Sequence, residues 1–227
     1  MTPALDAIDR DGAVREAADA LSGRRELLGG ALTVLGAAAG LAVPAAARAG
    51  VERRDRAVLR YALSLEYLQS AFYTEAERLG ALRGDVAAAA RALGAVERAH
   101  VHAFRELLGE RGSARPRFDF GGATEDELAF LHTGAALEDL CVGAYAGQAT
   151  RIESPEILQA AVGIHSVEAR HAAWLRRLLA VRPTVAALDR PRERRSVVGA
   201  IAAKGFVVRR SELPTTHRAG ASPRFTG

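Results

Sequence analysis

Four glutamates and two histidines of this chain fall into two matching sets. The first set takes one glutamate from residues 65–68 (LEYL) and a Glu-x-x-His motif from residues 97–100. The second takes one glutamate from residues 137–140 (LEDL) and the same motif from residues 168–171. The six residues are Glu66, Glu97, His100, Glu138, Glu168 and His171. Carboxylates and imidazoles suit iron and manganese ions, so these residue types predict metal chemistry.

The repeat extends beyond these six residues. A tyrosine follows each single glutamate by seven residues, at Tyr73 and Tyr145, and a pair of leucines follows each histidine, at residues 107–108 and 178–179. One Glu-x-x-His motif alone carries little information, but two copies in register with two further glutamates are hard to obtain by accident. We interpret the two sets as duplicated halves related by a pseudo-twofold axis.

Four helices of similar length are expected to carry these residues. The pattern predicts them over residues 55–82, 85–108, 124–151 and 154–181. Their expected start signals are Asp55, Asp85, a capping box at residues 124–127 (TEDE), and Ser154 followed by Pro155. Short connections join the first pair and the second pair, and the linker between the pairs is long. This order predicts an all-α fold, a four-helix bundle of two antiparallel hairpins joined by a long crossover.

Each of the four glutamates lies near the middle of its predicted helix. Antiparallel pairing brings helix middles together, so the four carboxylates should meet at one height in the core. Isolated buried carboxylates cost several kcal/mol or more, and four of them repel one another. No arginine lies on these helix faces. Two divalent cations would balance the four negative charges.

This ligand set has a known pattern. One glutamate from each of two helices and Glu-x-x-His from each of the other two make a carboxylate-bridged dinuclear site. We therefore expect two iron ions, with two manganese ions as the alternative. Cys141 is the only cysteine, which excludes an intramolecular disulfide and a cysteine-based zinc site.

Residues 61–73 (YALSLEYLQSAFY), taken with the two Glu-x-x-His motifs and residues 137–145, resemble the exported ferritin-like domain proteins, including those called desiccation-related. The resemblance covers about residues 55–181 and implies the ferritin-like fold. Residue by residue, it implies metal ligation by the six residues named above, with Glu97 and Glu168 as the bridging ligands. The set is also similar to those of bacterioferritins and manganese catalases.

The chain lacks features that are typical of some ferritin-like proteins, which narrows the choice among them. Met1 is the only methionine, so a bacterioferritin-type haem site is absent, and without a pair of cysteines a rubrerythrin-type electron-transfer module is absent too. Nothing indicates the fifth helix of a storage cage. Three classes remain open: a di-iron oxidase or peroxidase that takes dioxygen or peroxide in oxidative or desiccation stress defence, a manganese-catalase-like enzyme, and a non-catalytic iron-binding or structural stress protein. Oligomerisation also stays open.

The first 49 residues resemble an export signal. The pair Arg24-Arg25 precedes an apolar stretch that ends near Val43, and residues 47–49 (ARA) offer a cleavage site. We predict a twin-arginine-type signal peptide over residues 1–49, read by the twin-arginine export machinery, with no stable membrane span after cleavage. The protein would then be periplasmic or extracellular. An uncleaved membrane anchor and a buried amphipathic helix are the alternatives.

The positive charge is concentrated at the C-terminal end. The chain of 227 residues has a net charge of +4, and the residues from Arg182 onward account for it. An exported protein rarely meets nucleic acid, and this segment lacks interleaved aromatic residues, so we predict no nucleic-acid partner. The expected domains are the bundle over residues 50–182 and a solvated basic tail over residues 183–227 with at most a short helix.

Several further residues have two interpretations each. Tyr73 and Tyr145 could donate hydrogen bonds to metal ligands or serve as radical sites, although core tyrosines are the simpler interpretation. Cys141 is expected to be a buried small hydrophobe, and His165 a core or rim histidine or a spare ligand. The residues expected at the surface are His102 and His132. Those expected to fill the core or to hold the crossover are Phe104, Trp174, Phe118 and Phe120.

Overall fold

The computed structural model describes residues 53–109, 115–184 and 186–208. These residues form the long helices α3 (Arg53–Leu79), α4 (Gly84–Leu108), α5 (Glu127–Ala149) and α6 (Pro155–Leu178). A short 3₁₀ helix, η3 (Gly121–Thr124), precedes α5, and a fifth α-helix, α7 (Arg194–Ala203), follows the bundle. The predicted all-α class is confirmed. The predicted signal segment lies outside the described residues.

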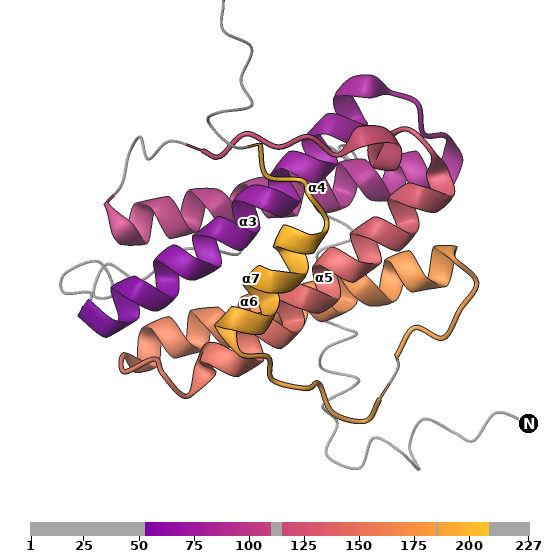
Figure 1. Cartoon of the computed structure of the whole chain (residues 1–227). Coiled ribbons are helices and arrows are strands. Elements are labelled where there is room, and N and C mark those ends of the chain that lie inside the picture. The colour runs from indigo at the N-terminus through magenta and orange to yellow at the C-terminus, as the bar shows by residue number, and fades with distance from the viewer. Residues whose placement is uncertain (1–52, 110–114, 185, 209–227) are drawn as a thin grey trace, which may run out of the picture. The chain divides into compact units, whose positions relative to one another are not determined.

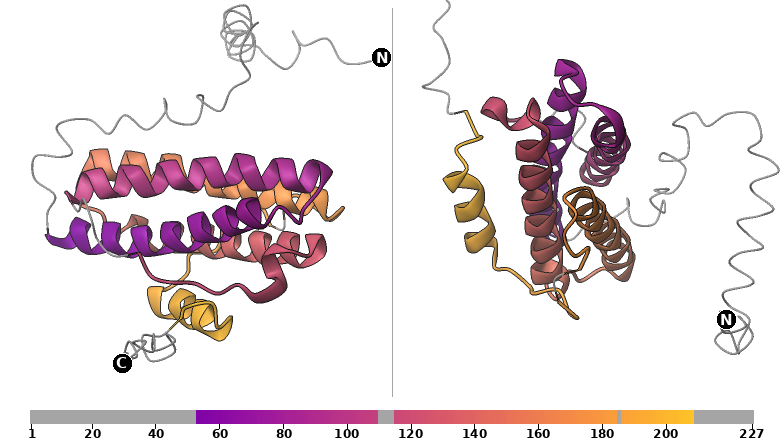
Figure 2. Two further views of the ribbon diagram at one scale, coloured as in Figure 1. Left: turned by 90° about the horizontal axis from the view of Figure 1, so that it is seen from above. Right: turned by 90° about the vertical axis from the view of Figure 1, so that its right-hand side faces the viewer.

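The long helices pair as the connectivity predicts. α3 packs mainly on α4, and α5 packs mainly on α6. Figure 2 shows α3 and α5 in one layer and α4 and α6 in the other, with α7 on the outer side of the α3/α5 layer. The described part of the crossover runs beside the bundle before it enters α5 (Figure 1). Two antiparallel hairpins therefore enclose one core.

The predicted start of α6 is confirmed in detail. Ser154 is the N-cap residue, and its hydroxyl accepts a hydrogen bond from the backbone N–H of Ile157 at 3.3 Å. Pro155 occupies the first helical position, where its missing N–H costs no intrahelical bond.

The capping box predicted for α5 is wrong by two residues. Thr124 ends the 3₁₀ helix, and its hydroxyl donates to Glu75 of α3 at 3.0 Å. Asp126 caps the helix and accepts from the backbone N–H of Ala129 at 2.8 Å. The extra turn of 3₁₀ helix delays the start of α5, which local capping signals do not reveal.

Asp55 and Asp85 also have roles other than the predicted N-caps. α3 already includes Arg53, and Asp55 lies buried in its first turn. The carboxylate accepts from the backbone N–H groups of Glu153 (2.8 Å) and Ser154 (2.9 Å), in the connection between α5 and α6. Asp85 lies inside the first turn of α4, because the cap position belongs to Arg83. Asp55 thus ties the start of one hairpin to the turn of the other.

The apolar core has two parts, and the predicted metal ligands lie between them. Along α3, the members of the first cluster end at Tyr67, and those of the second begin at Leu68. The second cluster contains a group of aromatic rings in which Phe72 stacks on Phe130 with ring centroids 5.1 Å apart. Close packing on both sides holds the helices that carry the ligands.

The described segment after α6 contains one short helix, within what we expected for the tail, and several of its residues pack on the bundle although most of the segment is exposed. Val197 of α7 is fully buried in the first cluster. The backbone N–H of Arg192 donates to the carbonyl of Gly143 in α5 at 2.8 Å. The ring of Phe206 meets Phe120 of the crossover at 5.2 Å. Apolar side chains and a backbone hydrogen bond thus join this segment to the bundle.

The expectation for Trp174 as core filler is wrong, because 43% of this residue is exposed. Phe104 and Phe120 are buried, and Phe118 stacks on Phe120, so those expectations are confirmed. Among the described residues, no helix combines the length and the hydrophobicity that crossing a membrane requires.

Candidate metal centre

All six predicted ligands meet in the middle of the bundle. α3 and α5 contribute one glutamate each, and α4 and α6 contribute one Glu-x-x-His motif each. The four glutamates have no exposed surface, and the histidines are 1% and 6% exposed. The i, i+3 spacing places each Glu and His of a motif on the same helix face. Buried helix faces thus converge on a strongly polar centre.

The ligand atoms form two overlapping groups. In the first, which we name position A, one donor atom from each residue lies within 4.8 Å of the others: Glu66, Glu97, His100 and Glu168. In the second, position B, the same holds for Glu97, Glu138, Glu168 and His171. Glu97 and Glu168 are the members common to both groups. This arrangement matches the bridging role that the family resemblance implies for them.

Several of these atoms approach closely without making hydrogen bonds. His171 Nδ1 lies 2.9 Å from Glu97 Oε1, and His100 Nδ1 lies 3.1 Å from Glu168 Oε1. Within the described residues, both oxygens of Glu97, Oε1 of Glu168 and Nδ1 of His171 lack a hydrogen-bond partner. Two ligands that bind one ion at about 2.1 Å and at right angles lie about 3 Å apart. The unpartnered atoms therefore have the spacing of metal ligands.

The electrostatics of the metal-free protein point the same way. Burial, and then the charges of Glu97 and Glu138, raise the pKa of Glu168 well above its usual value. Burial lowers the pKa of His171, but its contacts with Glu138 and Glu97 outweigh this and raise it to about 10. Without metal, the centre must hold protons to limit charge repulsion. Bound cations would replace those protons.

The sequence model of the family described as ferritin-like domain matches residues 54–181, more than half of the chain. This protein belongs to the ferritin-like domain family. No curated protein matches the chain. In the ferritin-like domain, the donor set and its unpartnered buried atoms fit two metal ions, although ligation by each of the six residues stays a prediction.

Two tyrosines of the ferritin-like domain cross between the hairpins. Tyr73 of α3 donates its hydroxyl hydrogen bond to Glu138 of α5, and Tyr145 of α5 donates to Glu66 of α3. Burial, and then the charge of the neighbouring glutamate, raise the pKa of both phenols well above the usual value. Both phenols therefore remain protonated donors. Of the interpretations left open, hydrogen bonding to the predicted ligands is the one the geometry supports.

Gln69 is a polar neighbour that the sequence analysis missed. Its amide nitrogen donates to Glu138 Oε2 at 2.6 Å and to Glu168 Oε2 at 3.1 Å, and its amide oxygen accepts from Cys141 Sγ at 2.6 Å. Cys141 is buried as expected, but its thiol serves as a donor. The signal was available, since Gln69 follows Glu66 by three residues on a buried face.

The other described histidines, His102, His132 and His165, belong to neither ligand group. His165 belongs to neither group, and its Nε2 lies 3.9 Å from an Asp189 carboxylate oxygen. It lines a small pocket between α5 and α6 together with Tyr145. The spare-ligand interpretation is therefore wrong for this structure. His102 and His132 are exposed, as predicted.

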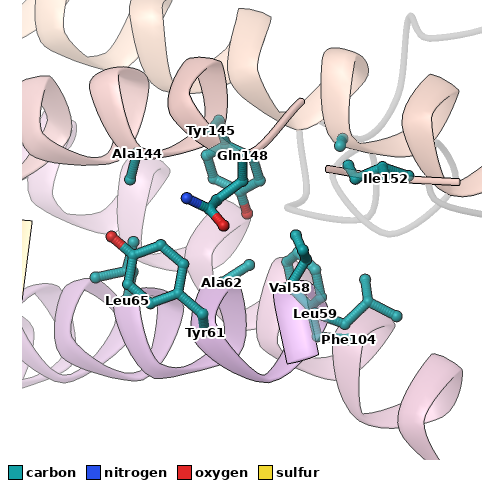
Figure 3. A pocket seen from close by; sticks show the side chains of 11 residues that line it. Val58, Leu59, Tyr61, Ala62, Leu65, Phe104, Ala144, Tyr145, Gln148 and Ile152 are labelled. Carbon is teal, nitrogen blue, oxygen red and sulfur yellow. The ribbon is translucent and has the colours of Figure 1, made fainter. Parts of the chain in front are cut away.

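An apolar pocket lies next to position A, at the end of the bundle where α3 begins. Figure 3 shows Tyr61 rising from α3 toward Ala144 and Gln148 of α5, with Tyr145 on the same wall. The Tyr61 hydroxyl is buried and has no hydrogen-bond partner among the described residues. Burial is the main cause that raises its pKa to about 12. Because Tyr145 also donates to Glu66, one side chain separates the pocket from the predicted ligands.

Proposed function

We propose that this protein is an exported ferritin-like protein that binds two metal ions, preferentially iron, at positions A and B and reacts with dioxygen or peroxide. One observation carries the proposal. Buried carboxylate and imidazole atoms from four helices converge at metal-ligand spacing, and several of them lack any other partner in the described part of the chain.

The chain's own residues define what the site can do. Glu97 and Glu168 can touch both ions, whereas Glu66 and Glu138 each reach one. Bound iron would supply electrons to an oxidant. Six protein ligands for two ions leave coordination positions open, which distinguishes a reactive site from a structural one. The hydroxyls of Tyr145 and Tyr73 each hold one carboxylate oxygen of Glu66 and Glu138, respectively. This contact orients the second oxygen of each glutamate toward its metal position.

The apolar pocket beside Tyr145 supports a small oxidant as the substrate. Its lining is mostly aliphatic and aromatic, which favours a small molecule with little charge. The pocket lies next to Tyr145, the partner of Glu66, which makes it a candidate approach to position A. We propose that removing such oxidants serves oxidative or desiccation stress defence.

Manganese is the second candidate. The donor set contains oxygen and imidazole atoms and no thiolate ligand, a combination that suits manganese as well as iron. A manganese form would favour peroxide dismutation, and an inert site would make the protein an iron-binding or structural stress protein.

Export is proposed from the segment around Arg24 and Arg25. The twin-arginine machinery carries folded proteins, often with a cofactor already inserted, which suits a metal site closed inside a bundle. Replacing both arginines with lysine should retain the precursor in the cytoplasm. Normal export of that variant would show that another pathway carries the protein, and mass spectrometry of the exported form should place its first residue near Gly50.

Metal analysis of the exported protein is the test of the site. We expect about two iron ions per chain, and consumption of dioxygen or peroxide by the reduced protein. Glu168→Gln should lose both properties. Glu156→Gln, on the exposed start of the same helix, is the matched control and should keep them. Trace metal after careful reconstitution would refute the proposal. Fast peroxide dismutation by the manganese form alone would favour the second candidate, and two inert forms would remove the enzyme interpretation.

A further inference from the structure

Gln69 and Cys141 occupy equivalent places in the repeat but are different residues. Each lies three residues after the single glutamate of its hairpin, Glu66 or Glu138. Both are almost completely buried, at 1% and 2% exposure, and they contact each other across the pseudo-twofold axis. The duplicated halves therefore differ at a position that lies one helical turn from the repeated single glutamate.

The Gln69 side chain supports position B more than position A. Its amide nitrogen holds Glu138, the glutamate found only in position B, and Glu168, which both positions share. The Cys141 thiol donates to the amide oxygen, and the carboxylates on the other side accept from the amide nitrogen. The thiol contact turns the amide nitrogen toward the carboxylates.

Glu66 has no equivalent support. One of its oxygens accepts from Tyr145, and the other lies 3.2 Å from Nδ1 of His100, itself a predicted ligand. In Glu138, Tyr73 and Gln69 each hold one oxygen, and neither is a predicted ligand. Residues that are not predicted ligands thus hold both oxygens of Glu138 but only one oxygen of Glu66.

We propose that Gln69, oriented by Cys141, is a positioning residue that makes the two metal positions unequal, so that position B binds the first ion more tightly. The inference rests on the proposed dinuclear site. A carboxylate already held in place loses less conformational freedom when it binds a cation. The hydrogen bond also withdraws some charge from the carboxylate oxygen, which by itself weakens metal binding. Loss of such supporting partners nevertheless weakens metal binding ~10- to 100-fold, so the positioning effect is the larger one.

Cobalt(II) titration of metal-stripped full-length protein tests this for each position separately. His100→Ala removes the imidazole of position A and leaves position B, and His171→Ala does the reverse. Adding Gln69→Leu should weaken Co²⁺ binding ~10- to 100-fold in the His100→Ala protein. In the His171→Ala protein the same change should weaken it less than about threefold. Calorimetry measures both affinities, and a purely structural defect would lower them together.

Cys141 provides a milder pair of variants. Cys141→Ser retains a donor to the Gln69 amide oxygen and should leave both affinities close to their starting values. Cys141→Ala removes the donor and should weaken position B alone. These changes in a small buried side chain keep the test valid if Gln69→Leu fails to fold.

The exchange variant Gln69→Cys with Cys141→Gln is the sharpest test, because it moves the amide to the other hairpin. The stronger position should then change from B to A. If the unsubstituted protein binds no metal, the proposed function is wrong and this inference falls with it. If that protein binds two ions but Gln69→Leu weakens both positions equally, or neither, the inference alone is wrong.

Discussion

The hairpins α3/α4 and α5/α6 carry the same predicted ligands in different surroundings. Each supplies one glutamate, one Glu-x-x-His motif and one tyrosine that reaches the other hairpin's glutamate. They differ at Gln69 and Cys141 in the core. They also differ on the outside, because α7 packs mainly on α5 and less on α3. The comparison teaches that duplication can build a site in matched pairs, while single residues beside the ligands make the halves unequal.

The largest expected effect, on metal content, distinguishes the glutamates that belong to both metal positions from those that belong to one. Glu97→Ala or Glu168→Ala removes a donor that belongs to both positions, so metal content should fall to near zero. Glu66→Ala or Glu138→Ala removes a donor from one position, so about one ion per chain should remain. Elemental analysis of purified variants measures the difference. Equal metal loss in all four variants would show that the shared pair has no special role.

Metal removal should make stability depend on pH. In the metal-free protein, the pKa of Glu168 is raised by burial and by neighbouring carboxylates, and that of His171 is raised to about 10. The folded state then holds protons that the unfolded chain releases at about pH 4.3 and 6.5. Raising the pH through these values therefore lowers the free energy of unfolding. The contribution of His171 to that free energy continues to fall up to about pH 10.

Thermal unfolding at several pH values measures this effect. The melting temperature of metal-free protein should fall steadily between roughly pH 5 and pH 9. The metal-loaded protein should melt higher and show a weaker dependence, because cations replace the protons. Identical curves for the two forms would contradict the prediction.

The packing of the α7 segment on α5 can be disrupted at Gly147 of α5. A Cβ atom at this position would collide with the backbone oxygen of Arg192, in the segment that leads to α7. Gly147→Ala should therefore cost about 1–3 kcal/mol in the free energy of unfolding and expose that segment to proteases. Gly163→Ala on α6 meets no neighbour and should stabilise the helix by up to about 1 kcal/mol. Similar effects at both glycines would mean that α7 does not depend on this close approach.

The smallest expected effect is on the Co²⁺ affinity of variants that lack one of the tyrosine hydroxyls that cross between the hairpins. Tyr73→Phe removes a donor to Glu138 and should weaken position B, and Tyr145→Phe removes a donor to Glu66 and should weaken position A. We expect about a tenfold loss of Co²⁺ affinity in each case. Titration in the His100→Ala and His171→Ala backgrounds assigns each loss to a position. Loss at the same position in both variants would contradict the crossed pairing.

Local rules predicted those parts of the fold that depend on neighbours along the chain. The Ser154 cap, the four long helices and their pairing were predicted because caps, periodicity and connection lengths act over a few residues. The cap of α5 was predicted at the wrong residue because the 3₁₀ turn depends on Thr124 reaching Glu75 in another helix. The packing of α7 was also missed, since it depends on Val197 finding space in a distant cluster.

For the candidate site, the sequence by itself determined which six residues could act as ligands and that they share one height in the bundle. Helical spacing puts Glu and His of each motif on one face, and antiparallel pairing aligns the helix middles. Only the tertiary structure decided that Tyr73 and Tyr145 cross between hairpins and that Gln69 supports Glu138 rather than Glu66. Those contacts join atoms on different helices, and their choice depends on side-chain geometry at a scale of a few tenths of an ångström, which spacing along one helix does not specify.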